Sequence, residues 1–431
     1  MGMRAGWLPA VAMAAALFAL ATPAHSQVRV PSISVPTAPL PTVVRDAGTL
    51  ATGTVGAVVA DARRLTIERL LKDNHAVLDR DPRGNPIVRD ELVALLSADR
   101  AGAVAWPAGV RVLRRAPVAS LDLELLVLSV PPGRSIHRLL KELRRSDAAT
   151  VFDYNHLYLE VGTETTPSSA PAARAPAVAD LTSAVVGMID AGVDVTHASL
   201  HGATVVSWGC ETPVPAAHGT AVASLIAGTD GAFHGAAPRA RVFAADVFCG
   251  RPTGGAVDAL AGAFGWLLER AVPVVNVSLV GPRNLALEML VVHAQSAGQI
   301  VVAAVGNDGP AAPPLYPAAY RGVIGVTGVD SKRRVLLEAN QGPQVSFAAP
   351  GADMVAAKVG GGYVEVRGTS FAAPIVAALL AERRTDVEAG CATCAVDLLA
   401  KQAIPIGGRS RGPVFGYGVV GEGARTAPER K

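Results

Sequence analysis

Short runs of apolar residues alternate with longer helical patterns along the second half of the chain. The strand-like runs lie at 184–189, 203–208, 241–245, 273–277, 299–304 and 322–327, and the helical patterns lie at 219–227, 256–270, 285–297 and 369–383. Strands that are apolar along nearly their whole length and alternate with helices are typical of a parallel sheet covered on both faces. The pattern therefore predicts a three-layer α/β/α domain around a mainly parallel sheet over 179–421, with functional residues at the carboxyl ends of the strands.

A smaller α+β unit is predicted ahead of this domain, over 111–165. Residues 121–130 have a strand-like pattern, 135–145 repeat apolar residues at helical spacing, and 151–161 return to strand-like alternation. The segment 166–178 that follows is rich in Thr, Ser, Pro and Ala, which predicts a flexible linker between the two domains.

The ends of the chain have weaker patterns. Residues 27–48 are rich in Pro, Ser, Thr and Val and predict an extended arm. Helical patterns are expected around 61–74 and 90–97, so that 27–110 is interpreted as an arm followed by a helical segment. Residues 422–431 are expected to form a loose tail.

The first residues predict export from the cytoplasm. Arg4 precedes an apolar run over 7–20, and small residues follow at Ala24 and Ser26. This order is typical of a secretory signal peptide over 1–26, and the run is short for a bilayer span of roughly 20 residues. We therefore expect a secreted or periplasmic protein without a membrane anchor after cleavage.

Composition and charge narrow the class further. Half of the 431 residues are apolar, and 39 Lys and Arg residues face 36 Asp and Glu residues, for a net charge of +3. A chain of this kind is globular rather than disordered. The charges are evenly spread, so no basic face for nucleic acid is expected.

The four cysteines fit an oxidising compartment, where disulfides persist. Four cysteines allow three pairings, and the order along the chain favours Cys210–Cys249 and Cys391–Cys394. The second pair forms a C-x-x-C sequence, but thioredoxin-like surroundings are missing around it. A zinc site would require four ligands, and no histidine lies close to these cysteines in the sequence to complete such a set.

Four polar residues stand at turns next to apolar segments. Ser370 lies in the sequence GTSFAAP over 368–374, where its hydroxyl could simply cap a helix. Taken one at a time, Asp190 is a strand-end turn residue, His218 a structural histidine, and Asn307 part of a turn. Each alone favours that structural interpretation.

Together the four residues form the set that acyl transfer requires. Serine becomes an effective nucleophile when a neighbouring base takes its proton, and histidine does so near neutral pH. An aspartate on the other ring nitrogen orients the imidazole, and an amide donor with the serine N–H stabilises the oxyanion. The order Asp190, His218, Ser370 is one of the known arrangements of this triad.

Five segments carry a resemblance to the subtilisin-like serine peptidases, with two shorter stretches at 235–238 and 316–318. The five segments are VGMIDAGV at 186–193, HGTAVASLIAG at 218–228, NVSL at 276–279, AAVGNDG at 303–309 and GTSFAAP at 368–374. The resemblance covers about 180–421. It implies that Asp190, His218 and Ser370 form the triad and that Asn307 is the oxyanion donor.

The same resemblance implies a substrate-binding edge and an inhibitory pro-region. The edge is Ser278-Leu279-Val280, which would pair with the backbone of a peptide. The region 111–161, with DYNHLY at 153–158, looks like a pro-domain that inhibits its own catalytic domain. The implied substrate-binding residues are Ser278, Leu279, Val280, Ala304, Gly306 and Leu315.

Two of these positions depart from the family pattern. Val280 stands where glycine is usual, and Leu315 stands where many relatives have a small residue. Both side chains would narrow the pocket. We therefore expect a preference for small or modest apolar residues before the cleaved bond.

The sequence thus predicts a monomeric, secreted serine endopeptidase that acts on proteins or peptides and is made as a self-inhibited zymogen. Two alternatives remain open. A narrow processing protease would cut one partner protein and would not degrade casein-like substrates. A binding module on the same fold would have lost catalysis and would not react with a fluorophosphonate.

No cofactor is expected from the sequence. Structural calcium is common in the resembled family, but none of the acidic loops has a recognisable ligand pattern.

Overall fold

The computed structural model describes residues 2, 52–168, 184–386, 391–408 and 411–429. Apart from residue 2, the signal peptide and the arm predicted from the sequence lie outside the described residues. The linker predicted over 166–178 lies outside them from residue 169 onward, and its first three residues are instead the end of a strand, Thr163–Ser168.

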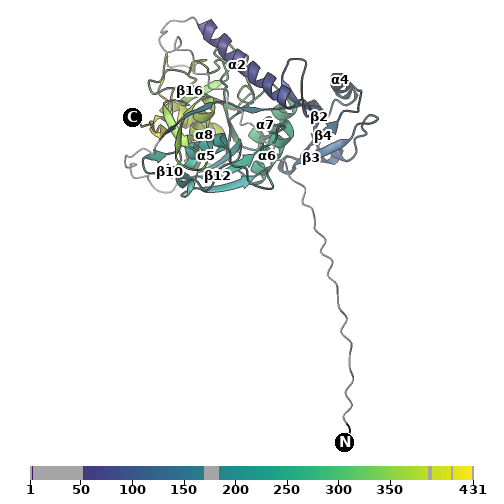
Figure 1. Ribbon diagram of the computed structural model, residues 1–431, viewed down its shortest axis with the longest axis horizontal. Helices are drawn as coiled ribbons and strands as arrows, with labels where there is room; N and C mark the ends of the chain where they lie inside the picture. Colours follow the sequence, from purple (N-terminus) through teal and green to yellow (C-terminus); the bar gives the residue numbers. More distant parts are fainter. Residues whose placement is uncertain (1, 3–51, 169–183, 387–390, 409–410, 430–431) are drawn as a thin grey trace. The chain divides into compact units, whose positions relative to one another are not determined.

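The main domain is built on a seven-stranded parallel sheet (Figure 1). Its order is β17-β16-β15-β13-β8-β12-β9. The bounds are β8 Val185–Asp190, β9 Thr204–Trp208, β12 Arg241–Asp246, β13 Val274–Val277, β15 Ile300–Ala304, β16 Ile324–Val329 and β17 Val345–Pro350. Most of these residues are buried, as expected for strands covered on both faces.

Helices cover both faces of this sheet, which confirms the predicted three-layer arrangement. One buried cluster joins α5, α8 and α9 to one face, and a second joins α6 and α7 to the other. Their bounds are α5 Ala217–Ala227, α6 Val257–Glu269, α7 Leu285–Ser296, α8 Thr369–Thr385 and α9 Ala392–Gln402. The described residues contain no helix with the length and apolar character needed to cross a membrane.

The small domain is an antiparallel sheet of order β1-β2-β4-β3, with β5 beside β2. One face packs on α4, and the other packs on α6 of the main domain. The bounds are β1 Leu78–Arg80, β2 Pro86–Ser97, α3 Ala98–Ala101, β3 Val112–Val118, β4 Leu123–Ser129, α4 Ile136–Ser146 and β5 Val151–His156. The sheet therefore also includes residues upstream of the expected boundary at 111.

The helix expected around 90–97 is wrong, because this segment is the central strand β2. It pairs with β4 on one side and β5 on the other. Leu92 and Val93 are fully buried although they point to opposite faces of the sheet. A strand buried on both faces has no alternation, so its apolar run is easily mistaken for a short helix.

The other upstream helix is present, as α2 over Thr52–Asp73. It contacts the chain that leads from the small domain into the main domain through the short strands β6 Leu159–Glu160 and β7 Thr163–Ser168. The remaining strands are β10 Thr229–Asp230, β11 Phe233–His234, β14 Leu279–Val280, β18 Met354–Ala357 and β19 Tyr363–Arg367.

Candidate active site

Asp190 and His218 are joined at the carboxyl end of the sheet. Asp190 is the last residue of β8, and His218 is the second residue of α5. The His218 Nδ1 atom lies 2.8 Å from the Asp190 Oδ1 atom, and Asp190 is fully buried. A carboxylate accepts, so Nδ1 carries the proton and the Nε2 atom is the one that can take a proton from a neighbour.

Ser370 lies in the first turn of α8. The N-cap of this helix is Gly368, so the Ser370 hydroxyl does not cap it. Instead the Ser370 Oγ atom donates to the Ser278 carbonyl oxygen at 3.0 Å, and the Ser278 hydroxyl donates to the Ser370 carbonyl oxygen at 2.9 Å. Within the described residues, no hydrogen bond joins Ser370 to His218. The serine hydroxyl would have to turn from Ser278 to reach the imidazole.

Asn307 follows β15 and faces the start of α8. Its side-chain oxygen accepts from the Thr369 N–H at 3.1 Å and from the Thr369 hydroxyl at 3.0 Å. Because these bonds hold the Asn307 oxygen against Thr369, the amide nitrogen points away from the Thr369 N–H. A Cβ atom placed on Gly368 would lie 2.7 Å from this nitrogen and 2.6 Å from the Gly162 Cα atom. The Asn307 amide is therefore a donor that faces the backbone around Gly162.

The chain itself passes through the predicted substrate-binding edge. Strand β6 pairs antiparallel with β14, with Glu160 opposite Leu279 and Leu159 opposite Val280. On the other side, the Tyr158 N–H donates to the Gly255 carbonyl oxygen at 2.8 Å. Residues 157–160 thus form the middle strand between two edges of the main domain, as a bound peptide does in strand addition.

Beyond this strand the chain crosses the catalytic side chains. The Val161 carbonyl oxygen lies 3.4 Å from the His218 Nε2 atom. A Cβ atom on Gly162 would lie 2.6 Å from the ring of Phe371, which follows Ser370. From Thr163 onward the chain pairs with β19, the strand that leads into α8. The bond between Val161 and Gly162 therefore lies beside His218 and close to Gly368 and Phe371, on either side of Ser370.

Several of the predicted pocket residues share a buried cluster with Val161. Val161, Val280 and Ala304 belong to one buried cluster, with Leu315 packed against it. A Cβ atom on Gly306 would lie 2.5 Å from the Leu315 Cδ1 atom, so the leucine side chain covers this glycine. Leu315 thus occupies space beside Gly306, and its effect on substrate preference stays a prediction.

One acidic group at this site was missed by sequence reasoning. Ligand atoms of Glu160, Asp190 and His218 all lie within 4.8 Å of one another. Burial raises the pKa of Glu160 to about 7, an effect that His218 opposes and Asp190 strengthens. No local pattern marks Glu160, because its position depends on the pairing of β6 with β14.

The charge of the imidazole follows from the same cluster. Burial disfavours the imidazolium and lowers the pKa of His218. The charge and the hydrogen bond of Asp190, with the charge of Glu160, outweigh burial and raise the pKa to about 10. With residues 157–168 in place, the imidazolium form of His218 is therefore favoured at neutral pH, and only the neutral fraction can act as a base.

Among the described residues, the ligand atoms of Cys210, Asp246 and Cys249 also lie within 4.8 Å of one another, as do those of Glu160, Asp190 and His218. Judged by these distances alone, either group could hold a metal ion. The two sulfurs are joined in a disulfide, so they are not thiolate ligands. The structure also contains the Cys391–Cys394 disulfide, and both pairs are those that the order along the sequence favoured.

Comparison with known proteins places these features in a family. A sequence profile of the subtilase family matches residues 182–390. Subtilisin DY of Bacillus licheniformis is 33% identical over 201 residues, which are 44% of this chain and 73% of that protein. The minor extracellular protease Epr of Bacillus subtilis is 29% identical over 241 residues, 54% of this chain and 37% of that protein.

A solved structure shows the same fold. Fervidolysin from Fervidobacterium pennivorans, described as a keratinolytic enzyme related to subtilisin, superimposes with a TM-score of 0.65 at 20% identity. The likeness covers 78% of this chain and 61% of that chain. This share is larger than the main domain alone, so the shared fold includes residues of the small domain.

Proposed function

Because the chain belongs to the subtilase family of serine endopeptidases, we propose that it is a secreted enzyme that hydrolyses peptide bonds through Asp190, His218 and Ser370, and that it is made as a self-inhibited zymogen. The observation that carries this proposal is the strand formed by residues 157–160. It pairs with the predicted substrate-binding edge and brings the Val161 carbonyl oxygen to 3.4 Å from the His218 Nε2 atom.

The proposed reaction uses each side chain in turn. The Ser370 Oγ atom attacks the carbonyl carbon while the His218 Nε2 atom takes the hydroxyl proton. Asp190 stabilises the imidazolium, and the Asn307 amide with the Ser370 N–H stabilises the oxyanion. His218 then gives the proton to the leaving amine. Water hydrolyses the resulting acyl-enzyme by the same route in reverse.

The small domain is proposed to act as the inhibitor, held by polar contacts at two helix ends. The Asp153 carboxylate accepts from the Leu285 N–H at 2.7 Å, at the start of α7. The Asn155 side chain donates to the Asp258 carboxylate at 3.0 Å, in the first turn of α6. A carboxylate at a helix N-terminus is favoured by the unpaired N–H groups and by the helix dipole.

Helix α2 supports the same role for residues 52–73. Leu71 belongs to one buried cluster with Leu157 and Leu159 of the inhibitory strand and with Ala256 of one of its edges. The Arg63 Nε atom lies 3.2 Å from the Asp308 carboxylate, next to Asn307. We infer that α2 covers the inhibitory strand and delays its release.

Secretion is proposed from three observations. The first residues have the signal-peptide pattern, the chain contains two disulfides, and one relative is an extracellular protease of Bacillus subtilis. Protein or peptide substrates are proposed from the family.

Self-cleavage is expected between Val161 and Gly162. Purified full-length chain, incubated and analysed by mass spectrometry, should give one fragment that ends at Val161 and one that begins at Gly162. Val161→Arg should slow the cleavage because Leu315 and Val280 narrow the pocket, whereas Val161→Ala should be cut at a rate close to the parent's. A first cut within 166–178 would contradict the register of β6 against β14.

The first cut is also expected to depend on Glu160. Its negative charge raises the pKa of His218, so removing it should lower that pKa and increase the fraction of neutral imidazole at a given pH. Glu160→Gln should therefore speed self-cleavage at pH 8, by up to about tenfold for each unit of pKa change. The midpoint of the pH–rate profile should move to lower pH.

Glu164→Gln is the matched control, since Glu164 lies four residues further along the same segment. Its effect on the midpoint should be smaller than that of Glu160→Gln. Equal midpoints for the parent and Glu160→Gln would show that the Glu160 carboxylate does not control His218.

A further inference from the structure

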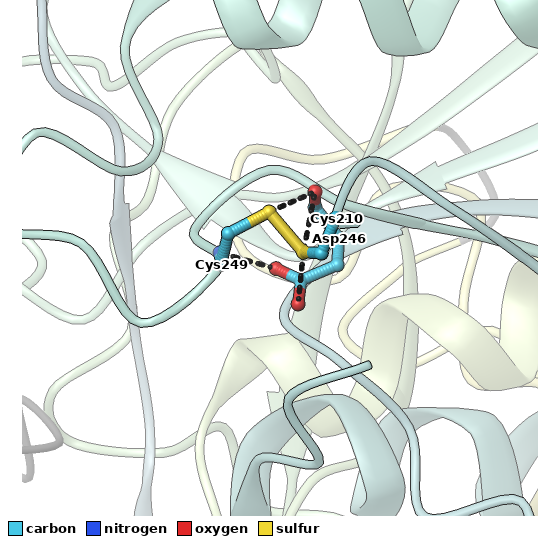
Figure 2. Close-up of side chains that lie close together, drawn as sticks. All are labelled: Cys210, Asp246 and Cys249. Carbon is cyan, nitrogen blue, oxygen red and sulfur yellow. Dashed lines mark hydrogen bonds between the residues drawn. A yellow bond between two sulfur atoms is a disulfide. The ribbon is translucent and has the colours of Figure 1, made fainter. Parts of the chain in front are cut away.

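The Cys210–Cys249 disulfide lies beside the catalytic end of the sheet. Cys210 follows β9, Cys249 follows β12, and Asp246, the last residue of β12, pairs in register with Asp190 on β8. Figure 2 shows the Asp246 side chain lying against the disulfide. Its carboxylate accepts from the Phe248 and Cys249 N–H groups, each at 2.9 Å, and its other oxygen lies 3.1 Å from the Cys210 sulfur.

One chain segment leads from this disulfide to the histidine. Residues 210–216 run directly into α5, whose second residue is His218. The Ala216 N–H donates to the Gly192 carbonyl oxygen at 3.0 Å. A Cβ atom on Gly192 would lie 2.1 Å from the Val214 carbonyl oxygen and 2.9 Å from the Asp246 carboxylate. Residues 210–216 therefore pack between the loop that follows Asp190 and the region of Asp246 and the disulfide.

A second segment leads from the disulfide to the substrate-binding edge. After Cys249 the chain turns back, and the Gly255 N–H donates to the Val247 carbonyl oxygen at 2.9 Å. The Gly255 carbonyl oxygen then accepts from Tyr158, and Ala256 forms a bridge with Leu157. The edge that holds the bound strand is thus a few residues from Cys249.

We propose that the Cys210–Cys249 disulfide, supported by Asp246, is a redox-sensitive brace that positions both His218 and the Gly255–Ala256 edge for catalysis. The proposal rests on the proposed peptidase function. The disulfide touches no reacting atom. It acts by holding together the two segments that start at its sulfurs, so that its reduction loosens the base and one substrate edge at the same time.

The test compares two pairs of cysteines in the same enzyme. The variant Cys210→Ser/Cys249→Ser loses the brace, and Cys391→Ser/Cys394→Ser loses the disulfide at the start of α9. Both are matured from full-length chain, and kcat and KM are measured per active site titrated with a fluorophosphonate. A misplacement near 1 Å can cost on the order of a hundredfold in rate. We therefore expect kcat to fall about 10- to 100-fold and KM to rise in the first variant, with both constants close to the parent's in the second.

A reduction experiment covers the case in which the first variant does not fold or mature. Mature Cys391→Ser/Cys394→Ser enzyme has one disulfide, which dithiothreitol converts to two thiols while it is itself oxidised to a cyclic disulfide. Activity should fall in step with the thiols that appear, while circular dichroism stays constant, and should return on reoxidation with oxidised glutathione.

The outcomes separate the brace from the peptidase assignment. Unchanged kcat and KM per active site after loss of the Cys210–Cys249 bond, with a lower melting temperature alone, would overturn the brace and leave the peptidase assignment intact. Absence of hydrolysis by the parent enzyme, before any cysteine is changed, would overturn the function on which the brace rests.

Discussion

Replacing Ser370 by alanine is expected to abolish peptide hydrolysis and to leave full-length chain uncut at Val161–Gly162. The hydroxyl is the group that forms the acyl-enzyme, and no other side chain at this site can replace it. Loss of the serine in a related subtilisin lowers kcat on the order of 10⁶-fold, and a loss of that size is expected here. Hydrolysis of a casein substrate and labelling by a fluorophosphonate measure the effect.

Ser278→Ala is the matched control for this prediction, because Ser278 is expected to pair with substrate through its backbone, which the substitution keeps. The Ser278 hydroxyl is buried within hydrogen-bond distance of Ser370 but donates to the backbone carbonyl, not to a reacting atom. This variant should still be labelled by the fluorophosphonate and should still hydrolyse casein. Labelling of Ser370→Ala at the parent's rate would place the nucleophile elsewhere and remove the basis of the proposed mechanism.

The fold and the catalytic candidates were accessible from local patterns. Parallel strands such as β13 and β15 are buried on both faces, so their apolar runs stand out, and the helical pattern expected at 285–297 between them corresponds to α7. Asp190, Ser370 and Asn307 stand at the ends of these elements. Short sequence motifs identify such element ends well, because few residue types fit a sharp backbone turn that also carries a functional side chain.

The missed features depend on contacts between distant segments. Strand β2 was mistaken for a helix because both of its faces are buried, one against α4 and the other against α6, and these two helices follow it in the chain. Glu160 approaches His218 through pairing with Leu279, and Leu71 of α2 reaches Leu159 through tertiary packing. Neither contact produces a repeating apolar pattern in the neighbouring sequence. The position of either residue could therefore not be predicted from local sequence.

Asp190→Asn is expected to lower kcat on the order of 10³- to 10⁴-fold while KM changes little. The Asp190 carboxylate accepts from the His218 Nδ1–H and keeps the Nε2 atom free to take the serine proton. An asparagine can instead donate its amide to Nδ1, which places the imidazole proton on Nε2 and blocks the base. Asp190 is fully buried, and among the described residues its side-chain hydrogen bonds go to Ala191 and His218 and not to the bound strand, so substrate binding should be largely retained.

The Asp190→Asn substitution should also shift the pH dependence of kcat in a defined direction. Asp190 raises the pKa of His218, so in the variant the imidazole should lose its charge at lower pH than in the parent. The midpoint of the kcat profile should therefore move to lower pH as the plateau falls. Asp330→Asn is the matched control, because Asp330 follows the end of β16 and bonds to Arg334 away from His218. Its kcat should stay within a few-fold of the parent's. A similar kcat for Asp190→Asn and Asp330→Asn would show that Asp190 does not orient the base.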